Sequence, residues 1–428
     1  MTTYEAALTW TGRCLERGMQ IEVAADGRIG AVGNRLSAEP VRLDRFALLP
    51  GFVNAHSHAF QRGLRGRGET FPDNAGSFWT WREAMYNLVD SLDVDKTYAL
   101  SKRAFDEMLA AGITTVGEFQ YVHHNATGEG FALDDAVIRA AHDAGIRLCL
   151  LQTYYRTGGI GKTLEGGQRR FATPDPETYW AQIDRLQSGM DDARQSIGVV
   201  AHSIRAVPLD DLVQLHEESQ RRGCVFHMHL EEQPQEIKDC VDRYGMTPLR
   251  VVNEHLSIDP RFTAVHCTHT ADADMDEFLA AGGHVCICPL TEANLGDGVA
   301  HVPGMVKRGG SVCIGTDSNS RISFTEEIRW LEYVQRVVRQ ERGSLRGGDG
   351  DVARPLFEMA TVHGAQSLGV RAGRLDPGAW ADLQLIDLDH AALHGWTEDT
   401  LLTSYLLGTG NEAIANTCVG GQWIKPLT

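Results

Sequence analysis

Two histidines, His56 and His58, offer the first chemistry that the sequence suggests. They follow an apolar run that has the composition of a buried strand. In a strand, residues i and i+2 point to the same face, so both imidazoles can enter one cavity while Ser57 points away. Such pairs also occur on exposed strands, so this pair alone leaves a metal site and a structural role equally open.

Similar side chains stand at the ends of three further apolar runs. His229 ends one run, His266 ends the next, and Asp317 closely follows the last. A lone histidine at a strand end is more often a hydrogen-bonded structural residue, but that explanation would have to hold at four strand ends. Neutral imidazoles and a carboxylate suit Zn²⁺, which in catalytic sites keeps one position open for water. The sequence therefore predicts a zinc site where these strand ends meet.

Glu232 lies three residues after His229. A loop glutamate is normally solvated, and that interpretation suits its neighbour Glu231. A glutamate one short turn beyond a metal ligand can instead reach the reacting centre and transfer protons. We predict this role for Glu232.

The elements that must position these residues alternate between short apolar runs and longer helical patterns. Eight strand-then-helix units fit an α/β fold, the (β/α)8 TIM-type barrel, in which loops after the strands build the active site. The expected strands are Leu48–Asn54, Thr114–Glu118, Arg147–Leu151, Ile197–Ala201, Cys224–His229, Thr263–His266, His284–Ile287 and Ser311–Ile314. The clearest helical patterns are Asp95–Ala111, Leu209–Arg222, Asp272–Ala281 and Thr325–Gln340.

Both ends of the chain differ from this middle. Short alternating runs and turn signals, such as Asp26-Gly27 and Gly420-Gly421, indicate strands and hairpins. We predict one small β domain from residues 1–47 and 371–428, flanking a catalytic barrel over residues 48–370. The long segment Gln61–Val94, with Trp79, Trp81 and Arg82, exceeds an ordinary connection, and such loops are usually functional.

The composition of the chain excludes some classes of partner and indicates the cellular compartment. The net charge of −17 argues against nucleic acid and anionic membranes, which need basic surfaces, and it requires local cations for any anionic substrate. Nine scattered cysteines without a CxxC pair argue against a disulfide framework. The sequence shows no signal peptide and no apolar stretch of the roughly 18–20 residues that span a bilayer. We expect a cytoplasmic protein that forms a homo-oligomer, with a dimer as the first expectation.

The sequence resembles the amidohydrolase superfamily over nearly the whole chain, and the strand-end residues are part of that resemblance. The carrying motifs are Pro50-Gly51-Phe52-Val53-Asn54-Ala55-His56-Ser57-His58 and Gly315-Thr316-Asp317-Ser318. The resemblance implies a terminal β-sandwich beside the barrel, and a metal held by His56, His58, His229 and Asp317. It also implies that Glu232 and His266 act on the bound water and the substrate. His269 competes with His266, which we prefer because it closes the apolar run.

Binuclear members of the superfamily carry a bridging lysine at the end of strand four. Here that strand ends Val199-Val200-Ala201-His202-Ser203, without a lysine. The resemblance therefore implies the mononuclear deaminase branch, with one Zn²⁺ per chain.

A narrower resemblance is to the formimidoylglutamate deiminases of histidine degradation. It rests on long strings of residues: Asn54-Ala55-His56-Ser57-His58-Ala59-Phe60-Gln61-Arg62, Ser77-Phe78-Trp79-Thr80-Trp81-Arg82-Glu83, His202-Ser203-Ile204-Arg205-Ala206-Val207, Thr291-Glu292-Ala293-Asn294-Leu295-Gly296-Asp297-Gly298 and Glu326-Glu327-Ile328-Arg329-Trp330-Leu331-Glu332-Tyr333. Glu231 departs from this family, which more often has a small residue there. We assign no catalytic role to Gly296-Asp297-Gly298, which has a plain turn interpretation.

This narrower resemblance implies hydrolysis of N-formimino-L-glutamate to N-formyl-L-glutamate and ammonia. Arg82 and Arg205 would bind the two carboxylates, since arginine offers a bidentate fork, and Gln61, Tyr121 and His202 would donate or accept hydrogen bonds. In the expected mechanism, Asp317 takes the proton of the water, His266 orients the nucleophile, and Glu232 protonates the departing nitrogen. The first alternative is a related aminohydrolase that acts on a nucleobase or another aminated ring. The second is a non-catalytic relative that serves as a scaffold.

Overall fold

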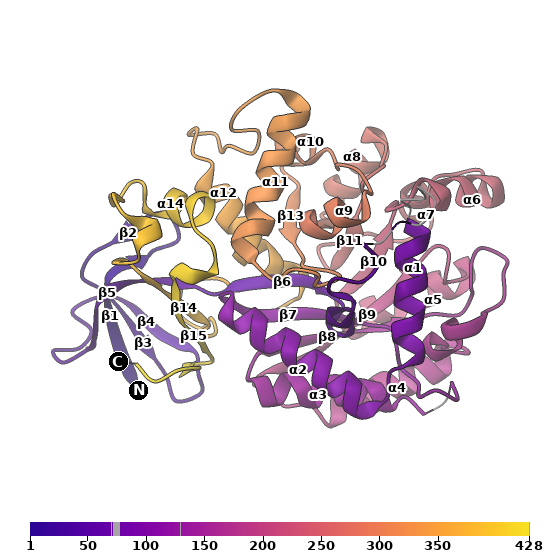
Figure 1. The fold of residues 1–428 in the computed structure, drawn as a ribbon, viewed down its shortest axis with the longest axis horizontal. Coiled ribbons are helices and arrows are strands. Elements are labelled where there is room, and N and C mark those ends of the chain that lie inside the picture. The colour runs from indigo at the N-terminus through magenta and orange to yellow at the C-terminus, as the bar shows by residue number, and fades with distance from the viewer. Residues whose placement is uncertain (70, 72–77, 129, 428) are drawn as a thin grey trace.

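Two eight-stranded sheets organise the chain, which the computed structural model describes at residues 1–69, 71, 78–128 and 130–427. The middle sheet runs in chain order with all neighbours parallel, and a bridge between Ser57 and Asp317 brings its two edges together. Helices surround this nearly closed barrel, which confirms the predicted (β/α)8 architecture (Figure 1). Its strands are β6 (Phe52–Ser57), β7 (Ile113–Gln120), β8 (Arg147–Tyr154), β9 (Gln195–Ser203), β10 (Phe226–Leu230), β11 (Phe262–His266), β12 (His284–Ile287) and β13 (Ser311–Ile314).

Local sequence signals set the helix ends. Asp93 begins α2 by accepting a 2.7 Å hydrogen bond from the Lys96 backbone N–H, and Gly223 ends α5 with a φ of +72°. The helices are α1 (Phe78–Asp90), α2 (Val94–Ala110), α3 (Ala132–Ala144), α4 (Pro176–Ser188), α5 (Leu209–Arg222), α6 (Pro234–Tyr244), α7 (Pro248–His255), α8 (Asp272–Ala280), α9 (Pro289–Leu295), α10 (Val302–Lys307), α11 (Phe324–Arg339), α12 (Ala353–Glu358), α13 (Gly364–Ser367) and α14 (Leu401–Gly408). None of the helices in the described ranges combines the length and apolar character that a bilayer crossing requires.

One predicted strand is wrong. The run Leu48–Asn54 is two strands, because β5 (Val41–Pro50) belongs to the terminal sheet and β6 begins only at Phe52. The chain passes from one sheet to the other at Gly51, where an added Cβ would lie 2.2 Å from Thr114 Cγ2. The other seven predicted strands overlap β7 to β13, and the four predicted helices coincide with α2, α5, α8 and α11 within a residue at either end.

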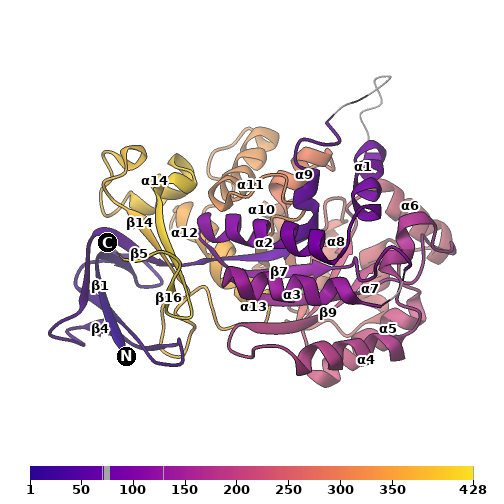
Figure 2. The ribbon, with the colours of Figure 1, turned by 60° about the horizontal axis from the view of Figure 1, so that its bottom comes forward.

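The second sheet combines strands from both ends of the chain, as predicted, and forms the small β-sandwich domain beside the barrel (Figures 1 and 2). Within it, β14 pairs antiparallel with β5, which joins the C-terminal strands to the N-terminal ones. Leu8, Ile21, Leu48 and Leu385 form part of its buried core. Its strands are β1 (Thr2–Trp10), β2 (Leu15–Glu16), β3 (Met19–Val23), β4 (Ile29–Asn34), β5, β14 (Leu383–Asp387), β15 (Ile414–Val419) and β16 (Gln422–Trp423). The division of the chain at residues 47/48 and 370/371 stays a prediction.

A buried ion pair ties the two sheets together. The guanidinium of Arg147, at the start of β8, donates to both carboxylate oxygens of Asp382 at 2.7 and 3.0 Å. Asp382 immediately precedes β14 and also accepts the Gly420 backbone N–H at 2.7 Å. Both ionic side chains are almost fully buried, so each depends on the other for its charge compensation.

We therefore expect Asp382→Ala to lower the free energy of unfolding by about 3–5 kcal/mol, because it leaves the Arg147 charge buried without a partner. Urea unfolding followed by tryptophan fluorescence would measure the change. Asp242→Ala is the control, since it removes the partner of Lys238 in an exposed ion pair and should change stability little. Equal stabilities of the two variants would contradict the role of this buried pair.

Candidate active site

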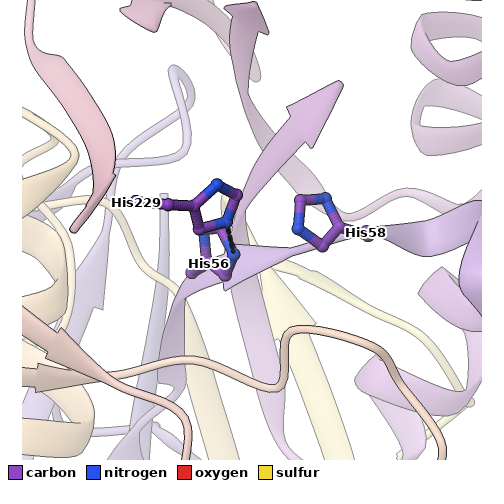
Figure 3. Close-up of side chains that lie close together, drawn as sticks. All are labelled: His56, His58 and His229. Carbon is purple, nitrogen blue, oxygen red and sulfur yellow. Dashed lines mark hydrogen bonds between the residues drawn. The ribbon is translucent and has the colours of Figure 1, made fainter. Parts of the chain in front are cut away.

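Three histidines converge at one end of the barrel. His56 lies in β6, His58 directly follows that strand, and His229 lies in β10 (Figure 3). The Nε2 atoms of His56 and His229 are 3.2 Å apart, and one ring nitrogen from each of the three residues lies within 4.8 Å of the others. The three side chains are buried, so the barrel holds their nitrogens together away from bulk water.

The electronic state of these rings fits a divalent metal. Burial lowers the pKa of His58 to about 3 and lowers those of His56 and His229 well below their usual value, which keeps the rings neutral. His58 Nδ1 donates to the Phe119 carbonyl at 2.9 Å, and His229 Nδ1 donates to the His202 carbonyl at 3.1 Å. These bonds leave Nε2 of both rings as an electron-pair donor, the arrangement that metal-binding histidines use.

Asp317 completes the cluster from the loop after β13. Its Oδ1 lies 3.4 Å from His58 Nε2 and 3.7 Å from His56 Nε2. Burial raises the pKa of this carboxyl group to about 7. Gly315 makes the approach possible, because a Cβ there would lie only 2.7 Å from His56 Cβ. Three imidazole nitrogens and one carboxylate oxygen form a donor set suited to zinc.

Backbone strain is concentrated at these strand ends. Five residues that are not glycine have φ values in the left-handed region, namely Glu231 at +54°, His266 at +75°, Cys267 at +51°, Asp317 at +48° and Asn319 at +54°. Such conformations cost free energy and persist where surrounding structure enforces them, which is typical of functional sites. Here the strain directs the His266 and Asp317 side chains away from regular strand geometry.

The two adjacent glutamates take different directions. Glu232 lines the cavity, with Oε1 4.0 Å from His266 Nε2 and Oε2 3.9 Å from Arg205 Nη2. Glu231 turns to α7, where its Oε1 accepts the Leu249 backbone N–H at 3.0 Å. Glu232 is therefore the glutamate that can reach a bound substrate.

His266 faces the same cavity, whereas its competitor His269 is absent from the described residues that line it. His266 Nε2 lies 3.7 Å from Asp317 Oδ2, and its Nδ1 donates to Glu292 Oε1 at 3.2 Å. Burial lowers the pKa of His266, but the carboxylates of Glu232, Asp317 and Glu292 outweigh this and raise it to about 10. Sequence reasoning missed Glu292, although it lies in a conspicuous string directly after β12.

A cavity lies above the histidines, and the unfilled space in and directly over it is about 640 Å³, including open solvent. The predicted site residues that line it are Gln61, Arg82, Tyr121, His202 and Arg205, together with His58, His229, Glu232, His266 and Asp317, while His56 lies fully buried in β6. Gln61 donates to the Tyr121 hydroxyl at 2.9 Å, and Arg82 donates to the Tyr86 hydroxyl at 3.0 Å. The cavity also has aromatic walls, formed by Trp81, which belongs to the long segment predicted to be functional, and by Tyr155 and Phe171, which sequence reasoning missed. Of the motif around Trp81, Ser77 lies outside the described residues.

Arg205 lies between two carboxylates. Its Nε is 3.7 Å from Oε2 of Glu236, a fully buried residue of α6, and its Nη2 faces Glu232. Burial raises the pKa of Glu236 to about 7. Sequence reasoning also missed Glu236, which offers a counter-charge to Arg205 at the wall of the cavity.

Comparisons with known proteins agree with this geometry. Residues 47–424 match the model of the Amidohydrolase family. The chain is 35% identical to formimidoylglutamate deiminase of Pseudomonas aeruginosa over 95% of this chain and 91% of that one. It is 25% identical to 5-methylthioadenosine/S-adenosylhomocysteine deaminase of Pyrococcus abyssi, over 91% and 84% of the two chains. The crystal structure of an amidohydrolase from Brucella melitensis superposes with a TM-score of 0.91 at 31% identity, covering 99% of this chain and 94% of that one.

The family match spans most of the chain, and the first relative is similar over nearly its whole length. Both agree with a barrel whose strand ends gather histidines, an aspartate and a glutamate. The chain therefore belongs to the amidohydrolase family and is a hydrolase that acts on C–N bonds other than peptide bonds.

Proposed function

We propose that this enzyme hydrolyses the formimino group of N-formimino-L-glutamate, giving N-formyl-L-glutamate and ammonia. The observation that carries the proposal is the position of Arg82 and Arg205, which line the same cavity as Glu232 and the histidine cluster. A dianionic substrate needs such local cations in a chain whose net charge is −17. The 35% identical relative, which is named a formimidoylglutamate deiminase, supports the same substrate.

We assign one Zn²⁺ per chain to the donor set of His56, His58, His229 and Asp317. Zinc, when bound in such a site, lowers the pKa of a coordinated water to about 7 and so supplies a nucleophile at neutral pH. The end of β9, Ala201-His202-Ser203, offers no lysine that could bridge a second metal.

The chain's own residues then move the protons. Asp317 accepts a proton from the attacking water, while His266 Nε2, 3.7 Å from Asp317 Oδ2, orients the oxygen. The oxygen forms a bond to the formimino carbon, and Glu232 passes a proton to the terminal nitrogen. The hydroxyl proton also passes to this nitrogen, so that breakage of the C–N bond releases ammonia and leaves the formyl group on the glutamate nitrogen. The proton taken by Asp317 then replaces the one that Glu232 gave.

Other residues that line the cavity bind the glutamate part of the substrate. Arg205 and Arg82 each offer a guanidinium to one carboxylate. Gln61, Tyr121 and His202 lie beside them with hydrogen-bonding groups that set the orientation of the substrate.

Purified protein should hold about one equivalent of divalent metal per chain, because the strand that ends at Ser203 has no lysine that could bridge a second metal. Elemental analysis after dialysis would measure the ratio. Two tightly held metals per chain would contradict the mononuclear assignment, and a metal-free but folded protein would favour a non-catalytic scaffold.

Arg205→Met and Arg82→Met should each lower kcat/KM for formiminoglutamate by roughly 10- to 150-fold, since a charge-assisted hydrogen bond contributes about 1.5–3 kcal/mol. The loss should shrink with formiminoglycine, which lacks the side-chain carboxylate, and the metal content should not change. Arg156→Met is the matched control, because Arg156 pairs with Asp211 and does not line the cavity among the described residues. Near-parental activity of both cavity variants would contradict the assignment of the substrate.

The aromatic walls favour one alternative, an aminohydrolase that acts on a nucleobase. Tyr121, Tyr155 and Phe171 could stack on a ring, and the 25% identical relative is named a 5-methylthioadenosine/S-adenosylhomocysteine deaminase. Ammonia release across a panel of formimino amino acids, adenosine derivatives and free nucleobases separates the two functions. Preference of the parent enzyme for an uncharged nucleobase would favour the alternative.

A further inference from the structure

We propose that Glu292 is a positioning residue, which fixes the imidazole of His266 so that its Nε2 faces the reacting centre. The inference rests on the proposed hydrolysis at this site, in which His266 orients the attacking water, and it does not depend on the identity of the substrate. It also gives a role to the string around Glu292, which the proposed function leaves without one.

The carboxylate of Glu292 is itself firmly held. Glu292 lies in α9, which begins directly after β12, and its side chain is buried. Its Oε1 accepts two hydrogen bonds, from the Cys288 backbone N–H at 2.9 Å and from His266 Nδ1 at 3.2 Å. The first bond fixes the carboxylate against the start of the helix, so the second can fix the imidazole.

The hydrogen bond to Glu292 fixes the orientation of the His266 ring, because it engages only one of the two ring nitrogens. With the proton held on Nδ1 by a carboxylate, Nε2 is directed to Asp317 Oδ2 at 3.7 Å and to Glu232 Oε1 at 4.0 Å. The backbone of His266 has a φ of +75°, so regular strand geometry does not direct this side chain. An anchor on the far side of the ring supplies that direction, and a charge-assisted hydrogen bond is stronger than a neutral one.

The chain offers a matched control in Glu327. This residue of α11 is also a fully buried glutamate, and its Oε2 accepts the Leu290 backbone N–H at 2.9 Å, near the same end of α9. No hydrogen bond or ion pair of the described residues joins Glu327 to His266. Glu292→Gln and Glu327→Gln therefore make the same change to two buried glutamates that both contact the start of α9, but only the first contacts the imidazole.

The experiment compares these two variants with the parent holoenzyme. Glu292→Gln should lower kcat by about 10- to 100-fold, a size typical of removing a carboxylate that orients an active-site histidine. KM and metal content should stay near the parental values, and Glu327→Gln should retain the parental kcat. As a readout that needs no turnover, the downfield ¹H signal of the Nδ1 proton, assigned by its loss in His266→Asn, should move or vanish only in Glu292→Gln.

Three results would overturn the inference. One is a parental kcat for Glu292→Gln, and another is an equal loss of kcat in both glutamine variants, which would mean a structural role alone. The third is a second metal that the parent holds and Glu292→Gln lacks. The donor atoms of His266, Cys288 and Glu292 lie within 4.8 Å of one another, so this result would make Glu292 a metal ligand. Kinetics are measured on whichever panel compound the parent hydrolyses, so a wrong substrate assignment would overturn the proposed function and leave this test intact.

Discussion

Glu232→Gln is expected to keep its metal and to lose about 10²- to 10⁴-fold in kcat, the contribution typical of a positioned acid–base group. The glutamine side chain keeps the shape of glutamate but cannot pass a proton to the leaving nitrogen. Glu232 is the group placed for that transfer, since it lines the cavity 4.0 Å from His266 Nε2 and beside Arg205. Ammonia release under saturating substrate measures kcat, and elemental analysis measures the metal.

Glu231→Gln is the control for this change, because it alters the adjacent residue in the same way. The Glu231 carboxylate accepts the Leu249 backbone N–H, and a glutamine oxygen can keep that bond. Its kcat should remain near the parental value. The assignment within this pair would be wrong if Glu231→Gln were the inactive variant and Glu232→Gln remained active.

The same pair shows where strand periodicity stops being informative. Alternation along β10 places His229 on the cavity face and would place Glu231 there too, two residues later. The strand ends at Leu230, and Glu231 has a φ of +54°, which breaks the alternation and turns its side chain to α7. Strand alternation alone points to Glu231, whereas the position of Glu232 three residues after His229, together with the family resemblance, identified Glu232.

Much of the fold was predictable because each barrel strand is a short apolar run followed by an amphipathic helix. Leu209–Arg222 is an example: its predicted bounds are those of α5, which ends at a left-handed glycine. The break at Gly51 escaped prediction because apolar residues continue on both sides, so hydrophobicity carries no sign that the chain changes sheets.

Residue patterns predicted the candidate site where a residue ends a strand. Arg82 in α1 was predicted through the family resemblance, and two glutamates supplied by helices were missed. His56, His229 and His266 stand at strand ends that a barrel brings together. Glu236 and Glu292 belong to helices, in which a glutamate is usually solvated. Only the three-dimensional packing shows that one faces Arg205 and the other faces His266, 26 residues earlier in the chain.

Replacing a histidine of β10 is expected to have the second large effect, a loss of bound metal. The two histidines of this strand, His227 and His229, differ in what their side chains contact. His229 faces His56 across 3.2 Å, between nitrogens that we assign to the metal. His227, two residues earlier and equally enclosed, pairs its Nε2 with the Ser367 carbonyl at 2.9 Å and is absent from the candidate metal clusters of the described residues. The two residues share a strand and a side-chain type, which makes them a matched pair.

His229→Asn should lose most of the bound metal, and kcat should therefore fall by more than the about 10- to 100-fold that is typical of changing a residue hydrogen-bonded to a metal ligand. The reason is that three histidines and one carboxylate make up the proposed donor set, and removing one leaves the set incomplete. His227→Asn should retain the metal, since it changes only a hydrogen bond to a backbone carbonyl. Elemental analysis of both variants, with thermal unfolding to verify that each is folded, measures the difference. Full metal content in folded His229→Asn would show that His229 is not a ligand. Loss of metal in folded His227→Asn would place the metal deeper in the barrel than the cluster of His56, His58 and Asp317.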